Sequence, residues 1–570
     1  MIKERLQALR HLLNQYNYAG YIVPSSDEYM SEYTPHYAKR LEYMTGFTGS
    51  NGVAVILPHI TLFFTDGRYL TQSKQQLDPE LFEVHNIADF FSFNWQNYIV
   101  REQKIAFDPR LFSNQYIHNL KNLTLVSEKR NLIDLIWSDQ PSRPQSKIFE
   151  YDAKYAGQAY EDKITLCRNF LSEYQSEALL ICDSASVCWL LNIRANDVDF
   201  CPILLSHLLI TKTEIYLFTE AQRNISEIDR GNLILMQMEK LPQILSSING
   251  KILFDENQAS IFLYNILSSL YSKHITNPCM LWKACKNSIE IEWAKKGHIQ
   301  DAVAVCEALA FINDNNLSEV TEFEIGQLLT EYRKLGNSYV LDSFPPICGY
   351  QDNGAVIHYR ACKKSAKKLR GSGLLLLDSG GHYMGSTTDI TRVILIGENK
   401  KEYVEYYTRV LKGHIALACV KFPKNKIAGS HLDVLARKFL WEVGADYGHG
   451  TGHGVGNFLS VHEGPQNISL AVAKTPLMAG MILSNEPGYY REGEFGIRIE
   501  NLMYVTEYPN DILGFEMLTL VPYAKNLIDL AMLSKEELDF LKDYYNKIGN
   551  TIAPLLSERA KSWLRSQIEF

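Results

Sequence analysis

The order of apolar runs and polar segments repeats itself in the first half of the chain. An apolar run, AGYIVPSSD (19–27), precedes a helix-like patch and further apolar runs, and EALLICDSA (177–185) opens the same series again. Short apolar runs that end in Asp and small residues are typical of buried strands in α/β domains. We therefore predict two related α/β domains, at about 1–145 and 146–286. The Pro- and Ser-rich segment SDQPSRPQSK (138–147) is the predicted linker between them.

The remaining region, 287–570, begins with a helical pattern. Asn287 with Glu290, and Thr321 with Glu324, have the spacing of capping boxes, in which two side chains satisfy backbone N–H groups at a helix N-terminus. Apolar residues follow the first box at intervals of three and four, which predicts an amphipathic helix. The sequence thus predicts a third domain that opens with helices.

Four predicted strands of this third domain each carry an acidic residue. GLLLLDSGG ends at Asp378, STTDITRVILI carries Asp389, and MILSNEP ends at Glu486. GIRIENLMYV places Arg498 and Glu500 on one face, because side chains along a strand alternate between its two faces. Four carboxylates on apolar strands of one domain indicate a shared polar site.

Buried carboxylates are costly unless a cation or hydrogen bonds compensate their charge. Arg498 balances one of the four, and a histidine balances at most another. Two divalent cations would balance all four, and oxygen ligands with one imidazole suit Mn²⁺, Co²⁺, Zn²⁺ or Mg²⁺. Metals ~3.5–4 Å apart can share carboxylates and lower the pKa of a shared water towards ~7. The glycine-rich stretch YGHGTGHGVGNFLSVHEGP supplies the candidate imidazoles His449, His453 and His462.

Composition and short motifs exclude several other classes of protein. The chain of 570 residues has a formal net charge of −8, which argues against a nucleic-acid partner, and we interpret the basic run RACKKSAKKLR (360–370) as a solvated loop. No apolar stretch approaches the ~18 residues of a membrane span, and the N-terminus lacks the pattern of a signal peptide. Scattered cysteines without a C-x-x-C pair favour a reducing cytoplasm. The sequence has no phosphate-binding loop, no G-x-S-x-G elbow and no H-E-x-x-H motif.

Several motifs, taken in order, resemble one enzyme family. DSGGHYMGSTTDITR, HGTGHGVGNFLSVHEGP, SNEPGYY and GIRIEN are similar to the Xaa-Pro aminopeptidases, or aminopeptidase P, which are metallopeptidases with the pita-bread fold. IVPSSDEYMSEY, GFTGSNG and TDGRY resemble the first domain of the long, three-domain cytosolic form. The resemblance implies an α/β (α+β) fold. It implies two related creatinase-type N-terminal α/β domains, at 1–145 and 146–286, and a pita-bread metallopeptidase catalytic domain at 287–570.

The resemblance also implies a set of metal ligands. Asp378 is expected to hold one metal, and Asp389 and Glu500 are expected to bridge both. His453 and Glu486 are expected to complete the other metal. The implied cofactors are two divalent metal ions, with Mn²⁺ expected and Zn²⁺ or Co²⁺ as alternatives.

The catalytic roles are likewise implied by the resemblance. Glu486 is expected to act as the general base or acid that handles the proton of the shared water. His462 is expected to bond the substrate carbonyl and to stabilise the oxyanion. His358 is expected to place the substrate, and His449 to line the pocket beside the metals. The implied catalytic residues are thus Glu486, His462, His358 and His449.

Further residues are implied to bind or support the substrate. Arg68, in TDGRY, resembles a family position that reaches the peptide, although an arginine after Asp-Gly also suits a turn that faces solvent. Tyr490 and Arg498 resemble supports of the metal ligands. The implied substrate-binding residues are Arg68, His358, His453, His462, Glu486, Tyr490 and Arg498.

The implied reaction is hydrolysis of the bond between an N-terminal residue and a following proline. Prolidase activity on Xaa-Pro dipeptides is the alternative within the same chemistry, and a catalytically inactive, peptide-binding pita-bread module is the alternative outside it. Expected partners are peptides with an Xaa-Pro N-terminus and a second copy of the chain, with neither nucleic acid nor membrane. The expected homodimer is cytoplasmic, and Trp441 and the segment TIAPLLSERAKSWL are candidate contacts.

Two features depart from the family pattern. His382 and Met384, in the predicted loop before Asp389, stand where the family commonly has Gln and a polar residue, and we expect them to alter the rim of the pocket. The basic loop 360–370 follows His358 where the family has an acidic or mixed loop.

Overall fold

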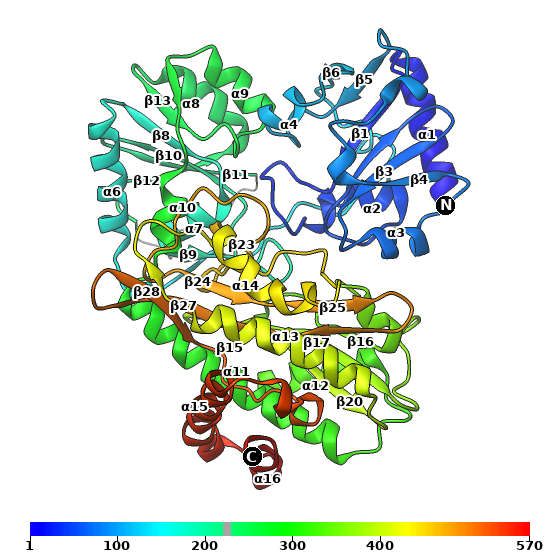
Figure 1. Ribbon diagram of the computed structural model, residues 1–570. Helices are drawn as coiled ribbons and strands as arrows, with labels where there is room; N and C mark the ends of the chain where they lie inside the picture. The colour runs from blue at the N-terminus through cyan, green and yellow to red at the C-terminus, as the bar shows by residue number, and fades with distance from the viewer. Residues whose placement is uncertain (221–229, 570) are drawn as a thin grey trace. The chain divides into compact units, whose positions relative to one another are not determined.

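The computed structural model of the protein describes residues 1–220 and 230–569 (Figure 1). The chain divides into two compact units, Met1–Ala153 with Gln158–Cys279, and Lys154–Gly157 with Met280–Phe570. The expected three-domain boundaries, after residues 145 and 286, stay predictions. Among the described residues, no helix combines the length and the apolar character needed to cross a lipid bilayer.

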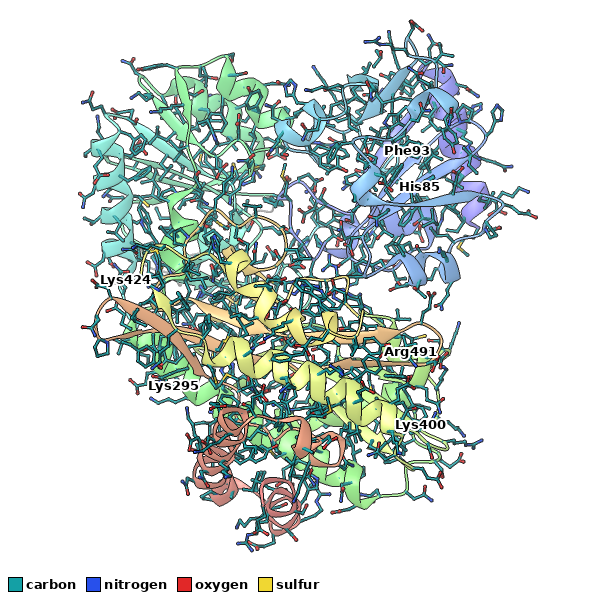
Figure 2. The ribbon with its side chains drawn as sticks, in the orientation of Figure 1. His85, Phe93, Lys295, Lys400, Lys424 and Arg491 are labelled. Atoms are coloured by element: carbon teal, nitrogen blue, oxygen red, sulfur yellow. The ribbon has the colours of Figure 1, made fainter. Side chains whose placement is uncertain are left out.

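The first unit contains two six-stranded sheets, and the first has the order β4-β3-β2-β1-β5-β6. β1 pairs antiparallel with β2 and parallel with β5, and every residue of β1 is buried. Aliphatic and aromatic side chains pack together in one buried cluster of this sheet, and the ring centroids of His85 and Phe93 lie 4.8 Å apart (Figure 2). The strands are β1 (Gly20–Pro24), β2 (Val53–Ile56), β3 (Thr61–Thr65), β4 (Phe82–Asn86), β5 (Lys104–Phe107) and β6 (Thr124–Ser127). The helices are α1 (Ile2–Gln15), α2 (Arg40–Thr45), α3 (Leu70–Gln76) and α4 (Asn114–His118).

The second sheet repeats this arrangement strand for strand, in the order β12-β11-β10-β8-β13-β14. β8 pairs antiparallel with β10 and parallel with β13, as β1 does with β2 and β5. The predicted repeat of two related α/β folds is therefore confirmed. The strands are β8 (Ala178–Ile181), β10 (His207–Thr211), β11 (Ile215–Thr219), β12 (Leu233–Gln237), β13 (Ile252–Phe254) and β14 (Ser272–His274), with the short pair β7 (Phe149–Glu150) and β9 (Ile193–Arg194) beside them in the sequence. The helices are α6 (Tyr160–Glu173), α7 (Ser184–Leu191), α8 (Leu241–Ser247) and α9 (Ile261–Ser268). The short helix α5 (Ala153–Ala156) belongs, apart from Ala153, to the second unit.

The second unit packs long helices against several small sheets. α13 lies along α14, and α11 lies along α12 and α16 (Figure 1). The helices are α10 (Pro278–Ala284), α11 (Ser288–Asp314), α12 (Glu322–Lys334), α13 (Lys401–Cys419), α14 (Gly429–Trp441), α15 (Lys535–Thr551) and α16 (Glu558–Ile568). Both predicted capping boxes are present, at the starts of α11 and α12.

Four sheets of this unit carry the acidic strands, in the orders β15-β18-β19, β16-β17-β20, β21-β28-β27-β24-β22-β23 and β25-β26. The strands up to β20 are β15 (Tyr339–Asp342), β16 (Ile347–Tyr350), β17 (Gly373–Ser379), β18 (Gly381–Tyr383), β19 (Ser386–Thr387) and β20 (Ile390–Ile396). The later strands are β21 (Phe422–Pro423), β22 (Gly452–Gly454), β23 (Glu463–Ile468), β24 (Ile482–Asn485), β25 (Gly488–Arg491), β26 (Phe495–Arg498), β27 (Asn501–Tyr508) and β28 (Ile512–Met517).

Two predicted strands are broken at their acidic residues, which corrects the continuous strands expected from the sequence. Asp389 lies between β19 and β20, and Glu500 lies between β26 and β27. The second break arises because β26 pairs with β25 whereas β27 joins the six-stranded sheet, so the chain leaves one sheet and enters another. At this junction the N–H of Glu500 donates to the carbonyl of Thr391 at 3.3 Å. Both carboxylates therefore lie where sheets meet.

Candidate active site

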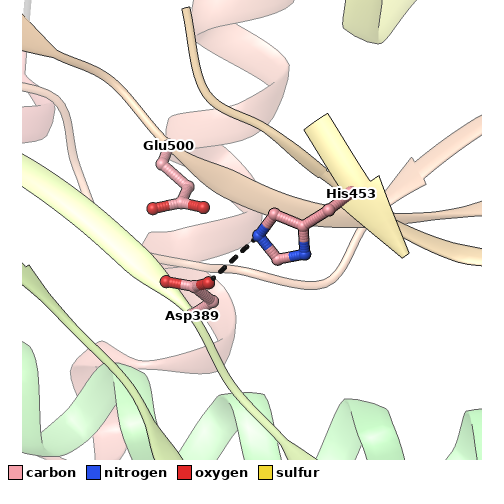
Figure 3. A group of neighbouring side chains, drawn as sticks. All are labelled: Asp389, His453 and Glu500. Atoms are coloured by element: carbon pink, nitrogen blue, oxygen red, sulfur yellow. Dashed lines mark ion pairs between the residues drawn. The ribbon is translucent and has the colours of Figure 1, made fainter. Parts of the chain in front are cut away.

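Three predicted ligands meet at this junction. Asp389, His453 and Glu500 each place one ligand atom within 4.8 Å of those of the other two. Nε2 of His453 lies 3.5 Å from Oδ2 of Asp389. Figure 3 shows the three side chains turned toward one another from separate segments of the chain. The structure thus assembles a cluster from residues that are far apart in the sequence.

The hydrogen bond of His453 orients its ring. Nδ1 lies 3.0 Å from the carbonyl oxygen of Gly454, which can only accept, so Nδ1 carries a proton. In the neutral form, Nε2 then presents a lone pair to Asp389 and to Oε1 of Glu486, which lies 3.6 Å away. A nitrogen lone pair and two carboxylates are all electron-rich, so a cation between them would stabilise this arrangement. A neutral imidazole with its other nitrogen bonded to a carbonyl is the usual form of a metal-ligating histidine.

Glu486 follows β24 directly, and hydrogen bonds hold it beside β22, the strand that contains His453. The hydroxyl of Ser484 donates to Oε1 of Glu486 at 3.2 Å, and its oxygen accepts the N–H of His453 at 2.9 Å. The N–H of Glu486 donates to the carbonyl of Thr451 at 2.8 Å. These bonds fix Glu486 relative to His453.

Arg498 connects Asp378 to the rest of the cluster. Its Nη2 atom lies 2.6 Å from Oδ2 of Asp378, and its Nε donates to Oγ1 of Thr391 at 3.1 Å. The Thr391 hydroxyl in turn donates to Oε2 of Glu500 at 2.8 Å. All five predicted metal ligands therefore belong to one connected group of side chains.

The electrostatics of the cluster fit a bound cation. Burial raises the pKa of Asp378, although Arg498 opposes the rise, and burial with neighbouring carboxylates raises the pKa of Asp389 and Glu500 well above the ordinary range. Oδ1 of Asp378 and Oδ1 of Asp389 are buried and have no hydrogen-bond partner among the described residues. Such unpaired oxygens are costly. Divalent cations would pair with both oxygens, and carboxylates with one imidazole are ligands that Mn²⁺, Zn²⁺ and Co²⁺ accept.

Comparison with known proteins places this cluster in a family. The family model described as "Metallopeptidase family M24" matches residues 292–507, which include all five predicted ligands. Xaa-Pro aminopeptidase 1 of Dictyostelium discoideum is 35% identical to this chain, over 100% of this chain and 96% of that protein. The chain belongs to metallopeptidase family M24. The description "Creatinase/Prolidase N-terminal domain" matches residues 5–135 and 139–290, and "C-terminal region of peptidase_M24" matches residues 511–569.

A solved structure resembles the chain over its whole length. X-prolyl aminopeptidase from Caenorhabditis elegans, described as a cytosolic enzyme with a di-nuclear active site, has a TM-score of 0.93 and 30% identity, over 100% of this chain and 99% of that chain. The prolidase from Pyrococcus horikoshii OT3, at 23% identity and a TM-score of 0.52, covers 64% of this chain and shows the shared fold alone. The predicted fold, with creatinase-type domains before a pita-bread metallopeptidase domain, is confirmed.

His449 lies beside the five predicted ligands, and burial keeps its ring neutral at neutral pH. Its Nδ1 lies 2.7 Å from the carbonyl of Gly450, so its Nε2 accepts from the hydroxyl of Tyr490 at 2.8 Å. Burial lowers the pKa of His449 to about 4, and burial raises the pKa of Tyr490 to about 12. The Tyr490 hydroxyl also accepts from Nη1 of Arg498 at 2.7 Å. The structure therefore brings both predicted supports, Tyr490 and Arg498, into contact with this histidine or with Asp378.

The other predicted residues are placed less directly. The ring of His462 packs edge-on against that of His453, with centroids 4.3 Å apart. His358 is half-buried in a turn, and the carbonyl of the preceding Ile357 accepts from Arg498 at 3.4 Å. Both residues thus belong to the same region as the ligands. Their catalytic roles stay predictions.

Arg68 lies in the first unit, just after β3. Its Nε and Nη2 atoms donate to the two carboxylate oxygens of Asp66, at 2.9 and 2.8 Å. This local ion pair agrees with the interpretation of Arg68 as a residue that stabilises a turn. Its predicted contact with a peptide stays a prediction.

Sequence reasoning did not assign Thr391 and Ser484 to the site. Each lies two residues from a predicted ligand on a strand expected from the sequence, Thr391 after Asp389 and Ser484 before Glu486. Because side chains alternate along a strand, residues two apart share a face. This alternation was the available signal for both hydroxyls.

The segment with His382 and Met384 is only partly the loop that the sequence predicted, because Met384 lies in the turn between β18 and β19 whereas His382 lies in β18. His382 is fully buried in β18, and its Nδ1 lies 3.0 Å from Oγ1 of Thr387, its cross-strand partner in β19. The loop prediction was wrong for His382, because Gly385, with φ of +89°, allows a tight turn that leaves His382 within a strand.

Three of the six basic side chains in the loop 360–370 pair with acidic neighbours. Lys368 and Arg370 both pair with Glu319, and Lys367 pairs with Asp352. These ion pairs support the interpretation as a solvated loop rather than a phosphate-binding segment.

Proposed function

We propose that this chain is an Xaa-Pro aminopeptidase, which releases the N-terminal residue from peptides that have proline in the second position. The observation that carries the proposal is the convergence of Asp389, His453 and Glu500, with Glu486 and Asp378 attached. This cluster occurs in a chain that matches a named Xaa-Pro aminopeptidase from end to end.

Five side chains are proposed to hold two divalent cations, with Mn²⁺ expected and Zn²⁺ or Co²⁺ as alternatives. Bound there, the cations would act as Lewis acids and lower the pKa of water. The ligands are Asp378, Asp389, His453, Glu486 and Glu500. The support for this set is the pair of unpaired, buried carboxylate oxygens and the orientation of the His453 ring.

The chain's own side chains have distinct roles around the scissile bond. Glu486 is proposed to take up and return the proton of the attacking water, and His462 to donate to the developing oxyanion. His449, neutral above a pKa of about 4, orients Tyr490 rather than transferring a proton at neutral pH. His358 is proposed to place the substrate, and Arg68 is proposed to bind the peptide.

Selectivity for proline follows from the substrate's chemistry. The nitrogen of an Xaa-Pro bond carries no hydrogen, and the ring fixes φ near −65°. The charged N-terminus of the peptide suits a cluster with several carboxylates. An aminopeptidase that accepts the ring therefore needs shape complementarity more than hydrogen bonds at this position.

The alternatives fit less well. Prolidase activity requires capture of the free carboxylate of a dipeptide, and the matching prolidase structure covers only 64% of this chain. A catalytically inactive module is disfavoured because all five ligands are retained. We also propose that the enzyme acts in the cytoplasm as a homodimer, for which the 42% exposed Trp441 at the end of α14 is a candidate contact.

The decisive experiment compares two peptides. Protein stripped with a chelator and resupplied with Mn²⁺ should cleave a peptide with proline second much faster than the same peptide with alanine second. Equal rates would remove the proline specificity, and cleavage of the Xaa-Pro dipeptide alone would establish a prolidase.

A pair of variants tests the ligands in the same assay. Asp389→Asn should abolish most activity because it removes a bridging carboxylate. Asp301→Asn is the matched control, since Asp301 is buried in an ion pair with Arg333 at 2.8 Å outside the cluster. If both variants lose activity equally, Asp389 has no special role.

A further inference from the structure

The strand that ends just before Glu486 and the strand that begins just after Glu500 carry a pair of buried asparagines. Asn485 in β24 and Asn501 in β27 are direct cross-strand partners, and both are fully buried. Each is the immediate neighbour of a proposed ligand, and neighbours on extended backbone point to opposite sides. The asparagines therefore lie behind the ligands, on the side of the strands away from the cluster.

Asn485 is tied to His414 by two hydrogen bonds. His414 belongs to α13, which begins after Lys400 (Figure 2). The amide nitrogen of Asn485 donates to the carbonyl of His414 at 2.9 Å, and Nδ1 of His414 lies 3.0 Å from the carbonyl of Asn485. The second bond makes Nδ1 the protonated nitrogen, because a carbonyl oxygen only accepts. The backbone just before Glu486 is thus fixed to a helix.

Nε2 of His414 must then accept a hydrogen bond, and the hydroxyl of Tyr523 provides it at 3.0 Å. Burial, with the nearby charge of Arg392, lowers the pKa of His414 to about 3, so the ring keeps this acceptor at neutral pH. The same hydroxyl accepts from the amide nitrogen of Asn501 at 3.0 Å. One hydroxyl therefore closes a chain of hydrogen bonds from Asn485 to Asn501.

Arg392 anchors the far end of this chain. Its Nη2 donates to Oδ1 of Asn501 at 2.7 Å, and its Nη1 donates to the carbonyl of Glu500 at 2.7 Å. The residue after Glu500 and the backbone of Glu500 itself are thus held by one buried guanidinium. The hydrogen bonds from Asn485 through His414, Tyr523 and Asn501 to Arg392 each pair a donor with an acceptor, so one flipped group would break the chain. Oδ1 of Asn485 is buried and has no hydrogen-bond partner among the described residues.

We propose that His414 and Tyr523 are positioning residues for the metal centre. Through the two asparagines they set the spacing of the strand ends that carry Glu486 and Glu500. The inference rests on the proposed dinuclear site, because spacing matters only if both carboxylates bind the same pair of cations. Partners behind metal ligands typically contribute ~10–100-fold in metal affinity. The hydrogen bonds of the two side chains run to Asn485, to Asn501 and to each other, so their effect on the cations would pass through the strand ends and the ligands.

The test measures Mn²⁺ affinity rather than activity. Tyr523→Phe removes the hydroxyl that joins the two asparagines, and His414→Asn keeps a donor near the Asn485 carbonyl but loses Nε2. Metal-free protein is titrated with Mn²⁺ by calorimetry, with competition against a chelator. We expect both variants to bind the more weakly held Mn²⁺ ~10–100-fold less tightly than the wild type. The double variant should lose less than the sum of the two single losses, because both break one chain.

Two controls separate positioning from general loosening of the core. Tyr545→Phe removes a neighbouring buried hydroxyl from α15, and His298→Asn removes a buried imidazole from α11 whose Nδ1 lies 2.7 Å from the Ala294 carbonyl of its own helix. The controls should bind Mn²⁺ like the wild type even where their thermal midpoints fall. Equal losses in controls and test variants would overturn the inference.

Failure of the inference is distinguishable from failure of the proposed function. A wild-type protein that does not bind two Mn²⁺ ions contradicts the dinuclear site, and with it the inference. Suppose that the wild type binds two Mn²⁺ ions, and that Tyr523→Phe folds and binds Mn²⁺ with the same affinity. This result overturns the positioning role alone. If Tyr523→Phe does not fold, His414→Asn decides the question by the same criterion.

Discussion

The residue after His462 offers a sharp test of the packing beside the active site. Glu463 is buried, and its two carboxylate oxygens face two buried ammonium groups, Lys283 at 3.0 Å and Lys286 at 2.6 Å. Glu463→Gln would leave two buried positive charges without a counter-charge. Removing one partner of a buried ion pair typically costs ~3–5 kcal/mol. At roughly 2–4 °C per kcal/mol for a large domain, the thermal midpoint of the second unit should fall by ~6–20 °C.

The matched control is Glu507→Gln, which removes an exposed carboxylate paired with Lys424 at 2.5 Å (Figure 2). Exposed ion pairs contribute only ~0–1 kcal/mol, so this variant should shift the midpoint by no more than a few degrees. Both proteins would be compared with the wild type by differential scanning calorimetry in the metal-free form. A Glu463→Gln midpoint as high as that of the control would refute the reasoning.

The same variant has a defined pH dependence. Burial alone would raise the pKa of Glu463, but Lys283 and Lys286 hold it below its ordinary value. A carboxylate with a lowered pKa stabilises the folded state above its unfolded pKa of ~4.3, and this contribution is lost as the pH falls through the folded value. The difference between wild type and variant should therefore be full at pH 7 and shrink in acid. A difference that grows in acid would contradict the assignment.

Three further outcomes follow from the cluster. His449→Asn should lower kcat but leave the acid limb of the pH–rate profile between pH 5 and 8 unchanged, because burial lowers the pKa of His449 to about 4. Loss of that limb in the variant would show that His449 titrates in this range. Mn²⁺ affinity should rise with pH, and binding should release protons, because burial and neighbouring carboxylates raise the pKa of Asp389 and Glu500 in the metal-free protein. Calorimetry in buffers of different ionisation enthalpy measures the number of protons released. Binding without proton release would contradict this prediction. Tyr490→Phe removes both hydrogen bonds of the hydroxyl, to His449 and from Arg498, each contributing ~0.5–1.5 kcal/mol, so kcat/KM should fall by ~5–150-fold. Steady-state kinetics with an Xaa-Pro peptide measure the fall, and an unchanged kcat/KM would contradict it.

The internal repeat and the acidic strand ends could be predicted because both are local properties of the chain. β1 and β8 are short apolar runs that end near Asp27 and Asp183, and such runs are visible without any structure. Asp378 and Glu486 likewise close apolar runs. Their meeting could be argued from charge alone, since buried carboxylates need compensation.

The breaks at Asp389 and Glu500 could not be predicted, because the partner strand decides where a strand ends. A sequence pattern gives the faces of GIRIENLMYV but not the change from one sheet to another at Glu500. The positioning chain was equally hidden. His414 and Asn485 are 71 residues apart, and a histidine in the helix α13 carries no signal of the strand it contacts.

The account depends most on two cations bound among five side chains. Crystals of the protein grown with Mn²⁺ and measured at the manganese absorption edge would locate the ions directly. We predict two anomalous peaks, with Asp389 and Glu500 between them, Asp378 on one and His453 and Glu486 on the other. No peak at this cluster, or peaks only at sites elsewhere in the protein, would contradict the central claim.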